Sequence, residues 1–260
     1  MYNFEFVKPS SVADAVAALG AEDAQALGGG QTLIPTMKQR LASPSKLVSL
    51  GGIADMQGVL VSGGSVTIGG ATTHADVEAA DAFAGLTGLA GGIGDPAVRN
   101  RGTIGGSLAN NDPAACYPSI ALATGATITT NKRDIAADDY FQGMFTTALE
   151  EGEIITAVSM PIPEASNYQK FEQPASRFAL VGVFVAKYAD GVRVAVTGAS
   201  ENGVFRWTEA EAALSANFSA DALADLSVDA ADMIADLHGS KAYRANLVKV
   251  LTGRAVAAAN

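Results

Sequence analysis

Two glycine-rich segments constrain this chain more than any other feature of its sequence. The first is Gly28-Gly29-Gly30-Gln31-Thr32, and the second is Arg101-Gly102-Thr103-Ile104-Gly105-Gly106-Ser107. Clustered glycines are typical of tight turns and of places where the backbone comes close to a ligand. Any fold for this sequence must therefore place both segments at positions of that kind.

The first segment lies between a predicted strand at 25–27 and a predicted helix that Thr32 could cap. Consecutive glycines can direct successive N–H groups toward one point, and the start of a helix adds partial positive charge, so a pyrophosphate suits such a loop. Another strand is predicted at 46–50. The β-loop-α-β order indicates a parallel pair with the loop at the carboxyl end of its first strand. For three glycines alone, a simple tight turn is the competing interpretation.

The second segment combines adjacent glycines with hydroxyl side chains. Thr103 and Ser107 could donate hydrogen bonds to phosphate or ribityl oxygens. Asn110, Asn111 and Asp112 follow directly. Polar side chains this dense beside glycines rarely serve packing, so we interpret the segment as a second ligand loop, with an ordinary surface loop as the alternative.

A third glycine pattern is a decoy. Residues 92–97, GIGDPA, match the G-x-G-x-x-A dinucleotide fingerprint. The pattern follows a predicted helical stretch where the fingerprint requires a strand. Asp95 would repel a phosphate, and Pro96 has no N–H to donate. We therefore expect no Rossmann-type site there.

Helix-capping patterns and the alternation of apolar and polar residues predict the remaining elements. S-x-x-D and T-x-x-D boxes at Ser11 and Thr73 each begin a helix, and a hairpin is expected at 59–69. The prolines at 161 and 163 mark a boundary. Beyond it, Ala189-Asp190-Gly191 is a strong hairpin signal, and helices end the chain.

Charge and cysteine content exclude several classes of protein. The net charge is −10 and the 17 basic residues are scattered, so no nucleic-acid surface is expected and phosphates must be held by backbone N–H groups. The single cysteine, Cys116, can form no internal disulfide and alone holds no iron–sulfur cluster or zinc ion. The N-terminal segment lacks the pattern of a signal peptide, and no apolar stretch reaches membrane-spanning length. We expect a soluble, cytoplasmic protein.

Both glycine segments resemble a known family. GGGQTLIP at 28–35 and RNRGTIGGSLANNDPAACYP at 99–118 are similar, in order and spacing, to the FAD-binding medium subunit of aerobic carbon monoxide dehydrogenases and other molybdenum hydroxylases of the xanthine dehydrogenase family. The likeness begins with an F-x-x-P-x-S-x-x-x-A pattern at 6–15, continues at 178–182 and ends at 236–244.

This resemblance implies an α+β fold. An FAD-binding domain at 1–165, of the type shared with vanillyl-alcohol oxidase and the MurB reductase, would contain two α/β subdomains at about 1–55 and 56–165. A C-terminal α+β domain at 166–260 would follow, with an antiparallel sheet and helices.

The resemblance also implies the positions of the cofactor-binding residues. The two glycine segments would cradle the FAD diphosphate, and the loop with Asn111 and Asp112 would continue around the cofactor. The expected cofactor-binding residues are Gly28, Gly29, Gly30, Gln31, Thr32, Leu33, Ile93, Gly102, Thr103, Ile104, Gly105, Gly106, Ser107, Asn111, Asp112, Cys116, Ile154, Ile155 and Lys170.

At the ring end of the cofactor, Ile93 would lie against the flavin, and Lys170 or a neighbour would approach the isoalloxazine. Ile154 or Ile155 would pack by the adenine or the ring system. One departure falls here, because the family has an Asp in a D-P-A-A-D-x-P pattern where this chain has Cys116. A thiol bonds the cofactor only weakly, and near a flavin it is either a target of oxidation or a buried, inert group.

A second departure follows Lys170-Phe171, where the family tends to have an arginine-rich run and this chain has Glu172-Gln173-Pro174. The sequence contains no pattern of catalytic residues that would act directly on a substrate. His74 lies just before a predicted helix and is expected to be structural, and His238 is expected to order a turn. Neither histidine has metal-ligand spacing.

We therefore expect a chain that moves electrons. The resemblance implies a large partner subunit with a molybdenum–pterin centre and a small one with two-iron two-sulfur clusters, assembled as a dimer of heterotrimers. FAD on this chain would pass electrons to an external acceptor, and a tight docking surface would be needed.

Two other functions compete with the electron relay. A self-sufficient flavin oxidase or reductase would need its own substrate pocket and general base, and the isolated chain would turn over a substrate. A non-enzymatic nucleotide-binding or scaffolding module would assemble with partners without holding flavin. For the relay, the substrate is chosen on another chain, so carbon monoxide, aromatic heterocycles and aldehydes are all open.

Overall fold

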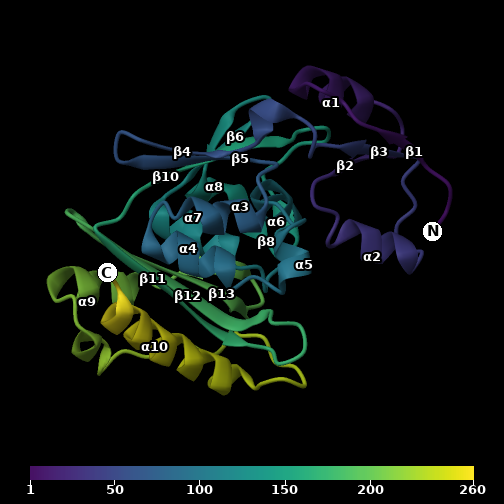
Figure 1. Ribbon diagram of the computed structural model, residues 1–260. Coiled ribbons are helices and arrows are strands. Elements are labelled where there is room, and N and C mark those ends of the chain that lie inside the picture. Colours follow the sequence, from purple (N-terminus) through teal and green to yellow (C-terminus); the bar gives the residue numbers. More distant parts are fainter.

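The N-terminal unit is a small parallel sheet with helices, at one side of the molecule in the computed structural model, which describes residues 1–260 (Figure 1). Its elements are β1 (Glu5–Val7), α1 (Val12–Leu19), β2 (Ala24–Leu27), α2 (Leu33–Lys38) and β3 (Lys46–Ser49). The strand order is β1-β3-β2, and both pairs are parallel. The predicted parallel pair is confirmed, and so is the capping box, because the Ser11 hydroxyl accepts the Asp14 N–H at 3.1 Å.

The central unit is a five-stranded antiparallel sheet covered by helices. Its elements are η1 (Ala54–Met56), β4 (Val59–Ser62), β5 (Ser65–Gly69), α3 (His74–Ala80), α4 (Ala84–Gly91), α5 (Pro96–Arg99), α6 (Ile104–Asn110), α7 (Tyr117–Thr124), β6 (Thr127–Thr130), β7 (Asp134–Ala136), α8 (Ala137–Tyr140), β8 (Phe141–Gly143), β9 (Thr146–Thr147) and β10 (Ile155–Pro161). The sheet order is β4-β5-β10-β6-β7, and β8 and β9 form a separate ribbon. The hairpin predicted at 59–69 and the helix predicted at Thr73 are confirmed.

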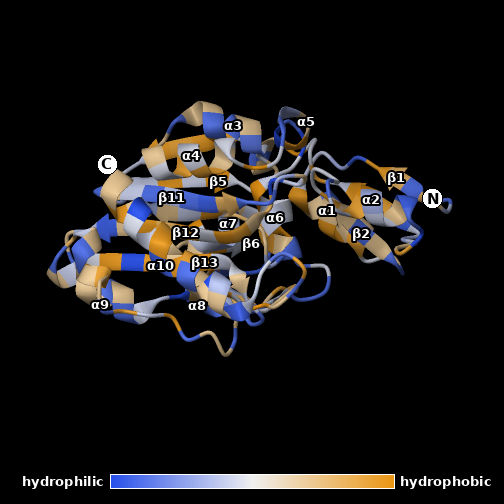
Figure 2. Cartoon of the chain, turned by 90° about the horizontal axis from the view of Figure 1, so that it is seen from below, coloured by the Kyte–Doolittle hydropathy of each residue, from blue (hydrophilic) through white to orange (hydrophobic).

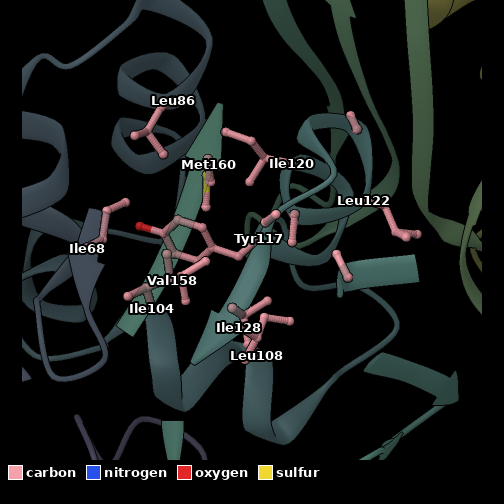
Figure 3. Packing of buried hydrophobic residues seen from close by; sticks show 14 of the residues in the cluster. Ile68, Leu86, Ile104, Leu108, Tyr117, Ile120, Leu122, Ile128, Val158 and Met160 are labelled. Carbon is pink, nitrogen blue, oxygen red and sulfur yellow. The ribbon is translucent and has the colours of Figure 1, made fainter. Parts of the chain in front are cut away.

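A single large core fixes this unit. Tyr117, on the fully buried helix α7, lies among Ile68, Leu86 and Val158 (Figure 3). These residues come from β5, α4 and β10, so the core joins both layers of the unit. Burying large side chains of this kind contributes about 1.5–3 kcal/mol each.

The C-terminal unit is a four-stranded antiparallel sheet between two layers of helices. Its elements are β11 (Ala165–Glu172), β12 (Ala179–Tyr188), β13 (Gly191–Ser200), β14 (Gly203–Arg206), α9 (Thr208–Ala216), η2 (Ala220–Leu223) and α10 (Lys241–Ala258). The strands follow one another in sequence order. Helix α10 packs on one face, and α4 and α7 pack on the other (Figure 1).

Alternation along β12 explains how one sheet serves two cores. Successive side chains of a strand point to opposite faces, so Phe184 and Ala186 join the core around α7, while Val183 and Val185 join the core beneath α10. Figure 2 shows hydrophobic residues on α4 and α10, the helices that cover the two faces. No helix in the structure has both the length and the apolar character that a bilayer crossing requires.

The structure corrects one prediction about local structure. The second glycine segment is the beginning of helix α6, with Thr103 as its N-cap, and so it is not a loop. The Thr103 hydroxyl accepts the Gly106 N–H at 3.1 Å. Two adjacent glycines made a helix unexpected, because glycine is a poor helix former, but their tertiary neighbours demand glycine at this place.

Candidate functional site

A cleft of about 740 Å³ opens where the N-terminal unit meets the rest of the chain. Its walls come from the turn between β2 and α2, the segments 93–116 and 153–155, and the end of β11 with the turn that follows. Cofactor pockets commonly span about 300–1,000 Å³. The cleft therefore has the size of a dinucleotide site, and all three units contribute to it.

Both glycine segments meet in this cleft. A Cβ at Gly29 would collide with the backbone of Arg101 and Gly102, and a Cβ at Gly28 would lie 2.8 Å from the Thr103 hydroxyl oxygen. At the other contact, a Cβ at Gly105 would lie 2.5 Å from the Gly70 carbonyl oxygen. These glycines are required because backbone packs directly on backbone, which brings the two segments together.

Five consecutive N–H groups of the first segment, from Gly28 to Thr32, donate to no acceptor in the chain. All five residues line the cleft. The three glycines are half-buried, and Gln31 and Thr32 are exposed, so these donors are accessible. A run of free N–H groups in a concave site suits an anionic ligand. This run fits the diphosphate of a dinucleotide.

The second segment offers different groups. The Gly105 N–H donates to the Gly70 carbonyl, the Gly106 N–H to the Thr103 hydroxyl, and the Ser107 N–H to the Thr103 carbonyl. Unlike the first segment, this one therefore has most of its backbone N–H groups bonded within the chain. Its free polar groups are the Thr103 N–H, the Ser107 hydroxyl, which has no partner in the chain, and the proton of the Thr103 hydroxyl.

Lys170 also lines the cleft. Its side chain extends from β11 and is only 5% exposed. The ammonium donates to the Gly92 carbonyl at 2.6 Å and to the Arg177 carbonyl at 2.8 Å, and lies 3.5 Å from a Glu172 carboxylate oxygen. Lys170 thereby ties the C-terminal sheet to the end of helix α4.

Cys116 lies beside this lysine, with 3.9 Å between Sγ and the Lys170 ammonium. The thiol is buried, and burial raises its pKa, so it stays protonated and is the inert type of thiol. The resemblance placed an Asp here. In this chain the carboxylate that faces Lys170 comes from Glu172, so the two departures from the family pattern act on the same ammonium group.

His74 belongs to the cleft wall as well. It is the first residue of α3, it is 5% exposed, and its ring lies 5.3 Å from that of Tyr117. Burial, together with the nearby Arg99 cation, lowers the pKa of His74 to about 4. The imidazole is therefore neutral at physiological pH.

Glu153, another cleft-lining residue, combines burial with an ion pair to Arg133. Burial alone would raise its pKa, but hydrogen bonds from Arg133, the Glu150 N–H and Thr130 lower it to about 2. The distance from Arg133 Nε to the carboxylate is 3.2 Å. This carboxylate fixes the segment that carries Ile154 and Ile155 into the cleft.

Most of the predicted site residues line the cleft, and two do not. Ile104 is fully buried in the core around α7. Asn111 is buried and donates from its side-chain amide to the Gly143 and Thr146 carbonyls at 2.8 and 2.9 Å, so it holds the β8–β9 ribbon. The others among the nineteen are cleft-lining: Gly28, Gly29, Gly30, Gln31, Thr32, Leu33, Ile93, Gly102, Thr103, Gly105, Gly106, Ser107, Asp112, Cys116, Ile154, Ile155 and Lys170.

Sequence reasoning missed several cleft residues. Leu27, Leu50, His74, Arg177 and Phe178 line the site but lie in no glycine motif. Only His74 carries a local signal, because it follows the predicted cap of α3. The prediction for His238 is also corrected, since its exposed side chain forms no bond and the turn is ordered by backbone N–H groups of 238 and 239 that donate to an Asp236 carboxylate oxygen.

The GIGDPA pattern at 92–97 follows a helix, as predicted, although Ile93 and Gly94 of this pattern line the cleft. Helix α4 ends at Gly91 before it, and Asp95 caps α5 by accepting the Val98 N–H at 2.9 Å. Thr32 is at the predicted start of α2, but its side chain makes no capping bond.

Comparison with known proteins agrees with this geometry. The family described as FAD binding domain in molybdopterin dehydrogenase matches residues 2–163. The carbon monoxide dehydrogenase medium chain of Afipia carboxidovorans is 34% identical over 277 residues, covering 98% of this chain and 96% of its own. The nicotine 6-hydroxylase medium subunit of Paenarthrobacter nicotinovorans is 34% identical over 270 residues, covering 96% and 95%.

Solved structures show the same relationship. A crystal structure of a Cu,Mo-CO dehydrogenase contains a chain that superposes with a TM-score of 0.87 at 33% identity, covering 98% of this chain and 96% of that one. A chain of quinoline 2-oxidoreductase from Pseudomonas putida 86 superposes with the same TM-score at 27% identity and the same coverage.

Proposed function

This chain belongs to the FAD-binding medium subunits of the molybdenum hydroxylases, and we propose that its cleft holds FAD as the relay between iron–sulfur clusters on a partner subunit and an external electron acceptor. The run of free N–H groups from Gly28 to Thr32, facing a dinucleotide-sized cleft, carries this assignment to the cleft. When bound, the flavin supplies the redox chemistry, because it can accept electrons from one centre and pass them to another.

At the phosphate end, this chain binds the diphosphate without a basic patch. The N–H groups of Gly28 to Thr32 would donate to phosphate oxygens, and the hydroxyls of Thr103 and Ser107 would donate beside them. The close packing of Gly29 on Arg101 holds the two segments in place before the cofactor arrives. This preorganisation lowers the entropic cost of binding.

At the ring end, Ile93 provides an apolar surface and Lys170 provides a buried cation. The ammonium is held by two carbonyls and by Glu172, so its position is fixed and its charge is only partly compensated. A cation at this end stabilises negative charge on the flavin ring. Cys116 remains a protonated neighbour.

The partner subunits complete the proposal. We assign a large molybdenum-binding subunit and a small iron–sulfur subunit, assembled as a dimer of heterotrimers in the cytoplasm. The substrate is chosen on the large subunit, and relatives named for carbon monoxide and for nicotine share this chain's sequence equally, at 34% identity. The sequence of this chain therefore supports assignment to a molybdenum hydroxylase complex. Carbon monoxide, heterocycles and aldehydes are its candidate substrates.

Purification of the chain with its natural partners tests the function. We expect a flavin absorption spectrum and, by mass spectrometry, two co-purifying subunits with molybdenum and iron. A colourless chain would contradict the assignment. Substrate turnover by the isolated, flavin-loaded chain would favour a self-sufficient oxidase or reductase, and assembly without flavin would favour a scaffolding module.

A further inference from the structure

The position of the His74 side chain is set by Gly102 and Tyr117. Its backbone N–H donates to the Gly102 carbonyl at 3.0 Å, which joins the start of α3 to the second glycine segment. A Cβ at Gly102 would lie 2.5 Å from His74 Nε2. The imidazole therefore reaches the cleft wall only because residue 102 is a glycine, and Tyr117 supports the ring from the core side.

Neither imidazole nitrogen has a partner in the chain. Nδ1 is enclosed and makes no hydrogen bond. Nε2 also makes no hydrogen bond, but it is not among the enclosed atoms, and His74 lines the cleft. His74 is a buried residue without a hydrogen bond, whereas buried polar groups are nearly always hydrogen-bonded. Of its two nitrogens only Nε2 is open to the cleft, so a ligand in the cleft can supply the missing bond there.

The position and charge state of His74 define what it can bind. It lines the same cleft as Gly28 and Lys170 and lies against Gly102 and Tyr117. Tyr117 follows Cys116, whose thiol lies beside Lys170. Burial and the Arg99 cation lower the pKa of His74 to about 4. A neutral imidazole offers one N–H donor and one lone pair, which suits a polar, uncharged edge better than a phosphate.

We propose that His74 is a cofactor-positioning residue whose Nε2 hydrogen-bonds the polar edge of the flavin ring. This inference rests on the proposed binding of FAD in the cleft. The bond fixes the ring relative to Lys170, and because the electron density at that edge changes on reduction, the bond stabilises the oxidised and reduced rings unequally.

His74→Leu tests this directly, with His74→Gln as the conservative variant and Tyr117→Phe as the matched control. Tyr117 contacts the imidazole ring of His74 but does not line the cleft. Its hydroxyl lies in the core and makes no hydrogen bond. FAD affinity and the flavin midpoint potential are measured on the purified complex after removal and titration of FAD. If His74→Leu does not fold, His74→Phe, which keeps the contact with Tyr117, replaces it.

We expect His74→Leu to weaken FAD binding about three- to tenfold, the range of one neutral hydrogen bond. The midpoint potential should shift as well, since a tenfold difference between oxidised and reduced flavin corresponds to about 30 mV for two electrons. His74→Gln should recover most of both values, and Tyr117→Phe should leave both unchanged.

Folded His74→Leu or His74→Phe with wild-type affinity and potential would overturn the inference, as would an affinity loss without any shift in potential, which would place the bond away from the ring. If the wild-type complex binds no FAD, the proposed function has failed instead. The two failures are therefore distinguishable.

Discussion

At the scale of single residues, close backbone approach decides the site. Gly29 contacts the backbone of Arg101 and Gly102, Gly105 contacts Gly70, and Gly102 leaves room for His74. Each glycine lets two segments that are distant in sequence touch. The glycines thus allow the close backbone contacts that form the walls of the cleft. The free N–H groups at 28–32 are then available to a ligand.

We predict that Gly29→Ala destabilises the protein by about 1–3 kcal/mol, the usual cost of overpacking, and lowers FAD retention at least severalfold because it separates the two segments. Gly51→Ala is the matched control, since a Cβ there meets no atom within 4 Å. Flavin content and urea unfolding measure both effects. Equal flavin content in the two variants would contradict the role given to Gly29.

A pH dependence follows from His74, which faces Arg99 of α5 and Tyr117 of α7. Its pKa is about 4 in the folded chain and about 6.5 when unfolded, so its contribution is complete above pH 6.5. Below that, the unfolded chain takes up the proton first, and stability falls by on the order of 3 kcal/mol by pH 4.

Urea unfolding of the wild type and His74→Gln at pH 7 and pH 5 measures this effect. The wild type should lose more stability than the variant over this interval. Glu153 does not contribute to the pH dependence in this interval. Its pKa is lowered from 4.5 to about 2, so the stability that it provides is lost only below pH 4.5. Identical pH dependence in both proteins would show that His74 is not buried as a neutral group.

At the scale of elements, buried ion pairs and hydrogen bonds fasten helices to sheets. Arg244 of α10 is 3% exposed and donates to the Leu180 carbonyl of β12 and the Gly198 carbonyl of β13 at 2.7 and 2.8 Å. It also pairs with Asp236 at 2.7 Å. The motif at 236–244 therefore anchors the last helix to the sheet.

Arg244→Met should cost about 2–5 kcal/mol, because it leaves two buried carbonyls and a carboxylate without their donor. Lys241→Met, three residues earlier on the same helix, removes an exposed pair with Glu201 at 3.2 Å and an exposed hydrogen bond to the Ala231 carbonyl at 2.7 Å. Because water can replace both contacts, it should change stability by less than about 1 kcal/mol. Chemical unfolding of both variants checks this, and similar losses would refute the anchoring role.

At the scale of the whole molecule, the C-terminal sheet serves two cores. Phe184 of β12 packs against Gly85 of α4, where a Cβ would lie 2.8 Å from the ring, while Val183 joins the core beneath α10. The boundary proposed at residue 165 is thus crossed by a continuous apolar interface. The FAD-binding and C-terminal units should unfold together.

Phe184→Ala should lower the free energy of unfolding by about 3–5 kcal/mol and preserve a single transition. The only tryptophan, Trp207, reports on the C-terminal core, and release of bound flavin reports on the cleft. Coincident transitions for both probes are expected. Two separate transitions would mean that the units are energetically independent.

Local patterns predicted much of the fold. The capping boxes at Ser11 and Thr73, the parallel β2–β3 pair and the hairpin around Asp190 appear as expected, because capping and turn chemistry act between residues close in sequence. Helix α6 was missed, because its glycines lower local helix propensity. Gly105 is explained by its contact with Gly70, and Gly106 by its contact with the Thr103 hydroxyl.

The sequence by itself determined the family, the cofactor class and nearly half of the residues that line the cleft, because the glycine motifs are local and specific. Only the tertiary structure decided that the second segment has few free N–H groups, that Glu172 faces Lys170 beside Cys116, and that His74 opens into the cleft. Each of these depends on contacts between segments far apart in the chain, which short-range patterns do not encode.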